Sequence, residues 1–75
     1  MRQQTVISLY NPIINMHIES HHKTDVSWCK SWADAEDFSS IFFLSRFFLR
    51  LKLQKISGVK LKWKRWQVYE GIGIA

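Results

Sequence analysis

The sequence predicts a small α+β domain with an N-terminal β-hairpin, a central helix and a basic C-terminal β-hairpin. Three patterns indicate this fold. Two strand-like stretches flank a turn within residues 5–19, apolar residues recur at helical spacing within residues 27–45, and apolar and basic residues alternate over residues 46–69. A chain of 75 residues is long enough for one such domain, spanning residues 1–75, with a small core.

The N-terminal hairpin is predicted from β-branched residues and a turn signal. Residues 5–10 are rich in β-branched and aromatic side chains, and Asn11 and Pro12 favour a turn. Apolar and polar residues then alternate over residues 14–19, which is typical of a strand with one solvent-facing side.

The central helix is predicted within residues 27–45. Its apolar positions recur every three or four residues: Trp28, Trp32, Ala35, Phe38 and Phe42. The acidic residues Asp34, Glu36 and Asp37 would favour the first turn of a helix, so a second helix start near residues 37–40 is also consistent with the sequence.

The basic C-terminal hairpin is predicted from an alternation of period two. A three-residue loop ending at Gly58 would place Leu53 opposite Leu61. A β-bulge at Lys64 and Arg65 would then keep the following aromatic residues on the apolar side. The alternative is a mostly α fold with one long helix spanning about 38–56, since arginines four residues apart would also align on a helix.

The charge is divided between an acidic half, residues 1–40, and a basic half, residues 41–75. The first half has three basic and five acidic residues, whereas the second has eight basic residues and one acidic residue. This asymmetry favours a basic contact surface and a polyanionic partner.

Basic residues interleaved with tryptophans predict a non-catalytic protein that binds RNA or another polyanion. Aromatic rings stack on bases while lysines neutralise phosphates, and the sequence lacks a helix-turn-helix that would favour duplex DNA. The predicted contact residues are Arg46, Arg50, Lys52, Lys60, Lys62, Lys64, Arg65, Trp63 and Trp66.

Two other binding functions fit the same composition. Residues 41–53, together with the tryptophans, would suit the surface of an anionic membrane. The apolar region over residues 41–49 would instead suit a protein partner, as in a small accessory subunit of a larger assembly.

The sequence indicates neither an enzyme nor a metal site, and it predicts no cofactor or small-molecule substrate. The metal-ligand types are His17, His21, His22 and Cys29, which lack the paired spacing of zinc motifs. As a nucleophile Cys29 would need a neighbouring base, for which no spacing argues. The three clustered acids are better explained as counter-charges than as a catalytic carboxylate pair.

Cellular location is predicted from the single cysteine and from the absence of targeting signals. One cysteine cannot form an internal disulfide, which favours an intracellular, reducing compartment. The N-terminus does not resemble a signal peptide, and residues 41–53 fall short of the roughly 20 apolar residues of a membrane span. Residues 70–75 are expected to form a frayed end.

Overall fold

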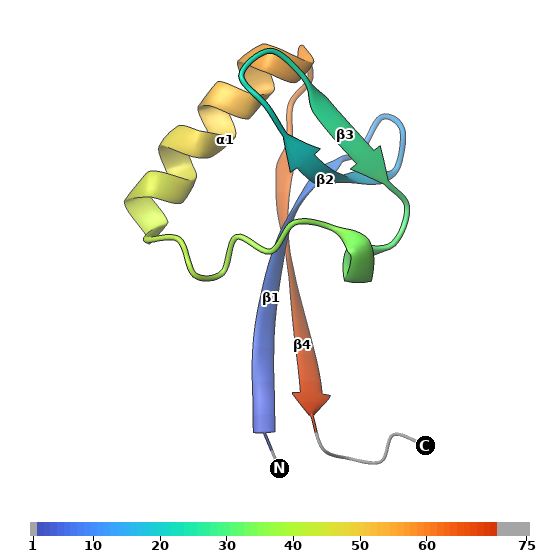
Figure 1. The fold of residues 1–75 in the computed structure, drawn as a ribbon, viewed down its shortest axis with the longest axis vertical. Helices are drawn as coiled ribbons and strands as arrows, with labels where there is room; N and C mark the ends of the chain where they lie inside the picture. The colour runs from blue at the N-terminus through green and yellow to red at the C-terminus, as the bar shows by residue number, and fades with distance from the viewer. Residues whose placement is uncertain (1, 71–75) are drawn as a thin grey trace.

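The computed structural model describes residues 2–70, with the side chains of residues 4–68, and confirms an α+β fold. A four-stranded antiparallel sheet has the order β3-β2-β1-β4, and one α-helix packs beside it (Figure 1). The strands are β1 (Arg2–Asn11), β2 (Met16–His21), β3 (Val26–Cys29) and β4 (Lys62–Glu70). A short 3-10 helix, η1 (Trp32–Asp34), and the helix α1 (Phe43–Ser57) lie between β3 and β4. The mostly α alternative is not supported.

The N-terminal hairpin is confirmed. β1 and β2 are antiparallel, with Tyr10 opposite His17 and Asn11 opposite Met16. The Asn11 side chain accepts a hydrogen bond from the Ile13 backbone N–H at 2.9 Å, and Asn15 takes the left-handed conformation with φ 56°. Asparagine tolerates this conformation better than most residues, so the turn is closed by local sequence chemistry.

The longest pairing joins the two ends of the described chain. β1 and β4 are antiparallel from Arg2 opposite Glu70 to Tyr10 opposite Lys62. In Figure 1 the lower halves of these two strands extend together beyond the rest of the molecule. Residues directly opposite each other share a face of the sheet, so Leu9 and Trp63 lie on one side and Ser8 and Lys64 on the other.

The core lies between the sheet and α1. Its fully buried cluster comprises Leu9, Ile18, Phe38, Leu53 and Leu61. Leu49 and Ile56 of α1 and Trp63 of β4 pack against it while remaining partly exposed. One side of α1 therefore anchors the helix to the sheet through Leu49, Leu53 and Ile56, which recur at intervals of four and three residues.

The predicted basic C-terminal hairpin is wrong, because its first strand is the helix α1 and its second strand pairs with β1. In the helix Leu53 is fully buried and Leu51 is 43% exposed, whereas a strand would have placed both on one face. The β1–β4 register continues without a bulge through Lys64 and Arg65, so these residues point to opposite faces. The apolar leucines occupy both sides of the helix, which produced the misleading period of two.

The predicted helix within residues 27–45 is also wrong, since α1 begins only at Phe43. Trp28 belongs to β3, opposite Ile18, and it reaches the core from a strand. The segment after η1 is irregular but tied to the sheet: the N–H of Phe38 donates to the carbonyl of Ile7 at 2.8 Å. The aromatic residues recur at helical spacing because Trp28, in a strand, and Phe38, in a loop, both pack into the same core.

Helix α1 ends at a glycine that the sequence had suggested as a turn. Gly58 has φ 78°, in the left-handed region, and its N–H donates to the Gln54 carbonyl at 2.8 Å. Glycine adopts this conformation without the steric cost of a Cβ atom, so it stops the helix and turns the chain toward β4. A frayed end was predicted over residues 70–75, and all of this segment after Glu70 lies outside the described residues.

Candidate anion-binding groove

A groove separates α1 from the β1–β4 pair. Its volume is about 540 Å³. The apolar part of its lining consists of Ile7, Phe43, Phe47 and Trp63, and the basic part of Arg46, Arg50, Lys64 and Arg65. In Figure 1, α1 meets β4 near the helix C-terminus and diverges from it toward the N-terminal end of the helix. The groove therefore combines aromatic walls with positive charge, and of the described residues none that lines it is acidic.

Three arginines supply the charge of the groove. Arg46 and Arg50 are one helical turn apart and both are half-buried. Arg65 is exposed and stands opposite Ile7, on the sheet face that carries Trp63. Lys64 contributes less to this site, because its Nζ lies 4.8 Å from the ring centroid of Tyr10, on the other face of the sheet.

Two of the arginines are held in place by main-chain carbonyls. Arg50 Nη1 donates to Gln54 Oε1 and to the Leu61 carbonyl, each at 3.3 Å. Arg46 Nη1 donates to the Phe38 carbonyl at 3.5 Å. Arg50 Nε is buried and has no hydrogen-bond partner within the described residues. Arg50 is thus a fixed guanidinium whose Nε–H is shut off from solvent without an acceptor, which is a costly arrangement.

The outer side of α1 is apolar and uncovered. Exposed large apolar side chains follow the helix and the residue before it: Phe42, Phe43, Leu44, Phe47, Phe48 and Leu51, each between 43% and 66% exposed. At 100° per residue the five of these positions that lie within the helix face away from Leu49 and Leu53, which contact the core, whereas Phe42 directly precedes the helix. A helix that is apolar on both sides is normally covered on both sides.

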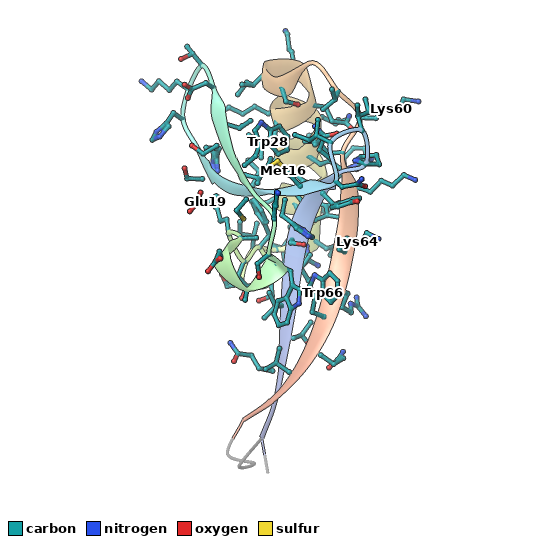
Figure 2. All side chains as sticks on the ribbon, turned by 90° about the vertical axis from the view of Figure 1, so that its right-hand side faces the viewer. Met16, Glu19, Trp28, Lys60, Lys64 and Trp66 are labelled. Carbon is teal, nitrogen blue, oxygen red and sulfur yellow. The ribbon has the colours of Figure 1, made fainter. Side chains whose placement is uncertain are left out.

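The remaining predicted contact residues lie on other surfaces. Lys52 is exposed on α1 outside the groove, and Lys60 is exposed in the loop before β4. Lys62 shares a sheet face with Tyr10 and Lys64, away from the groove. Figure 2 views the molecule from the side opposite α1 and shows Lys60 and Lys64 projecting from the β4 side. The basic half of the sequence therefore does not fold into one continuous face.

Both predicted contact tryptophans make internal contacts. Trp63 packs edge-on against Phe38, with ring centroids 5.5 Å apart, and forms part of the groove wall. Trp66 points to the opposite face and stacks on Trp32 at 5.2 Å. The rationale that both rings are free to stack on bases is therefore weakened, although neither is fully buried.

A polar network underlies Trp66. Trp66 Nε1 donates to Ser8 Oγ at 3.3 Å, and Ser8 Oγ lies 2.9 Å from Nδ1 of the buried His17. An indole N–H can only donate, so Ser8 Oγ is the acceptor in its hydrogen bond with Trp66, and the same oxygen is shared with the His17 ring. Burial first, and then the charge of Lys64, lower the pKa of His17 below its ordinary value of 6.5.

This network predicts a loss of stability under mild acid. The unfolded chain takes up a proton at His17 near pH 6.5, whereas the folded chain does so only at lower pH. The unfolded state therefore binds more protons in that window, and the free energy of unfolding falls as the pH drops from about 7.5 to about 5. Urea unfolding at both values measures the difference.

Two variants test whether His17 causes this pH dependence. His17→Gln should make the free energy of unfolding less dependent on pH, whereas His22→Gln, at an exposed histidine, should leave the dependence unchanged. Asp37 does not interfere: although burial opposes it, hydrogen bonds from Ile7 and Ser39 hold the pKa of Asp37 below 3.8, beneath the tested range. An unchanged slope in the His17 variant would contradict the assignment.

The other chemistry-bearing side chains form no catalytic constellation. His17 and Cys29 are cross-strand neighbours, and His21 Nδ1 lies 2.9 Å from Glu36 Oε1. Burial, Glu19 and Asp34 raise the pKa of the Cys29 thiol, which disfavours the reactive thiolate. Across residues 2–70, no group of three or more histidine, cysteine, aspartate or glutamate residues is placed to hold a metal ion.

Sequence reasoning identified part of this site. It named Arg46, Arg50 and Arg65 as anion contacts, and it noted the thin polar cover over residues 41–49. It did not find Ile7, which forms the far wall of the groove. No local signal could have done so, because Ile7 is brought there by the pairing of β1 with β4.

No family model, curated protein or solved structure matches this chain. In the part of the chain that the structure covers, no helix is both long enough and apolar enough to cross a membrane. Function must therefore be inferred from the groove and the surfaces themselves.

Proposed function

We propose that this protein is a non-catalytic binding protein for anionic surfaces, and that its partner is an anionic lipid membrane contacted by α1. The observation that supports this most strongly is the uncovered apolar side of α1, because five large apolar side chains of the helix, together with Phe42 directly before it, remain in water. Burial of such side chains is favourable by about 25 cal/mol per Å² of apolar surface.

Charge argues for an anionic partner. The 15 residues of α1 include four basic residues and no acidic one. Arg46 and Arg50 lie on one flank of the exposed apolar side, Lys52 lies beyond its other edge, and Lys55 lies within it near the C-terminal end of the helix. A second copy of the helix would bring like charges together, whereas anionic head groups would neutralise them.

A membrane fits the shape of this surface better than RNA does. Phenylalanine and leucine side chains on one side of a helix can enter the boundary between head groups and acyl chains while the basic flanks remain with the phosphates. An RNA backbone offers phosphates but no hydrocarbon to cover these residues. The depth of insertion would be that of a helix lying in the interface, not of a spanning segment.

RNA is the second candidate, and the exposed lysines favour it. Lys60, Lys62 and Lys64 are all exposed near or along β4, where they could contact consecutive phosphates. About four such contacts to single-stranded RNA would give a log–log salt dependence with a slope of about −3. A reducing intracellular compartment, proposed from the single free thiol of Cys29, suits either partner.

Parallel binding assays test these proposals. Sedimentation with phosphatidylserine vesicles should retain the protein, and retention should fall as salt rises, while phosphatidylcholine vesicles and single-stranded RNA should bind far less. Lys60→Ala with Lys62→Ala should weaken RNA binding and flatten its salt slope by about one to two units if RNA is the true partner. Binding to RNA but not to anionic vesicles would overturn the membrane proposal. Binding to neither would leave only a protein partner.

A further inference from the structure

The groove has a composition that a flat membrane contact does not require. Exposed lysines and an apolar helix side are sufficient for binding to a membrane surface. The groove adds three arginines, Arg46, Arg50 and Arg65, beside the aromatic walls of Phe47 and Trp63. This combination suits a single molecule with an anionic head and an apolar tail.

We propose that the groove binds the phosphomonoester head group of an amphiphile, with its hydrocarbon chain leaving over Phe43 and Phe47. The inference rests on the proposed membrane function for the source of this ligand, and it names the lipid class. The chain would pass from the groove directly onto the exposed apolar side of α1, to which both phenylalanines also belong.

Arginine chemistry favours a phosphate. The guanidinium group is planar and always charged, and it binds phosphate oxygens through paired N–H donors. Three guanidinium groups around one groove repel one another, so a phosphomonoester, which carries up to two negative charges, relieves more repulsion than a carboxylate.

The lining disfavours a nucleotide. A nucleotide phosphate could bind the arginines and its base could stack on Trp63, but the amino group of adenine, guanine or cytosine would find no side-chain acceptor in this lining. The side chains that line the groove are apolar or cationic; among the described residues that form it there is no serine, threonine, asparagine or glutamine. The volume of about 540 Å³ is ample for a phosphate together with the first part of an acyl chain.

A soluble short-chain lipid separates groove binding from membrane binding. Dihexanoyl phosphatidic acid, used as a monomer, should bind saturably by calorimetry and should shift the NMR signals of the Arg50 Nε–H and the Trp63 indole. Dihexanoyl phosphatidylcholine, inorganic phosphate and adenosine monophosphate are the comparison ligands, and each should bind at least about tenfold more weakly.

Matched double variants locate the site. Arg46→Gln with Arg65→Gln removes two groove charges and should weaken phosphatidic acid binding by about tenfold or more. Lys52→Gln with Lys55→Gln removes two charges from α1 outside the groove and should change the affinity for phosphatidic acid by less than about threefold. A second comparison uses apolar residues. Phe47→Ala should weaken phosphatidic acid binding more than Phe48→Ala does, since only Phe47 lines the groove.

The outcomes distinguish the groove from the membrane surface. Vesicle binding without saturable monomer binding would overturn the groove and leave the membrane function. Saturable monomer binding without vesicle binding would overturn the membrane function and leave the groove as a binding site. Equal effects of the two double variants, or adenosine monophosphate binding as tightly as phosphatidic acid, would overturn the inference. If the arginine variant does not fold, the shifts at Arg50 and Trp63 in the unaltered protein decide.

Discussion

Phe38→Ala should unfold a large share of the molecules at 37 °C. Phe38 is fully buried, and its ring packs against Trp63 at a centroid distance of 5.5 Å. Its backbone ties the irregular segment to β1 through Ile7 and accepts a hydrogen bond from Ile41 at 3.1 Å. Removal of a buried phenylalanine ring typically costs about 3–5 kcal/mol.

That cost is large for a domain of this size. Stabilities of about 0.05–0.15 kcal/mol per residue would give this chain roughly 4–11 kcal/mol in total. The melting temperature, followed by circular dichroism, should therefore drop by about 15 °C or more. Phe48→Ala makes the same chemical change at a side chain that is 66% exposed, and it should move the melting temperature by only a few degrees. Similar drops in the two variants would show that Phe38 does not hold the core.

Replacement of Phe42, Leu44 and Phe48 by alanine should reduce binding to anionic vesicles by roughly 100- to 1,000-fold. All three side chains are more than half exposed, and none lines the groove. Each would transfer apolar surface into the interface at about 1 kcal/mol or more, so their loss compounds. Thermal stability should stay nearly unchanged, because the core contacts of α1 remain.

The turn between β1 and β2 provides a matched control for this loss. Ile13 and Ile14 are 71% and 45% exposed, and in Figure 1 their turn lies on the far side of the sheet from α1. Ile13→Ala with Ile14→Ala should leave vesicle binding within about threefold. If the turn variant loses as much binding as the helix variant, the uncovered side of α1 is not the membrane contact.

Local chemistry determined several features that the sequence alone predicts. The turn at Asn11 and Pro12 pairs strands that are adjacent in the chain, so the N-terminal hairpin needed only nearby residues. The α+β class was predicted from a mixture of periodicities and is confirmed, although the helix and the second hairpin were assigned to the wrong residues. The segregation of basic residues into residues 41–75 is a property of composition, and two of these residues, Arg46 and Arg50, line the groove.

Only the tertiary structure decided the form of residues 43–57. Leu49 and Leu53 face the core, while Phe47 and Leu51 on the other side of the helix stay exposed. With apolar residues on both sides no amphipathic pattern is visible in the sequence, and the leucines at every second position then favour a strand. The same uncovered side that obscured the helix is what now indicates a partner.

Long-range pairing decided the groove. β4 pairs with β1, more than 50 residues away in the sequence. The register of this pairing places Arg65 opposite Ile7 and Trp66 on the same face as Ser8. Neither contact has a local signature, because the neighbours of a strand in a sheet are selected by burial of the whole apolar face. The sequence alone therefore determined which residues carry charge and apolar surface, and the fold determined which of them meet.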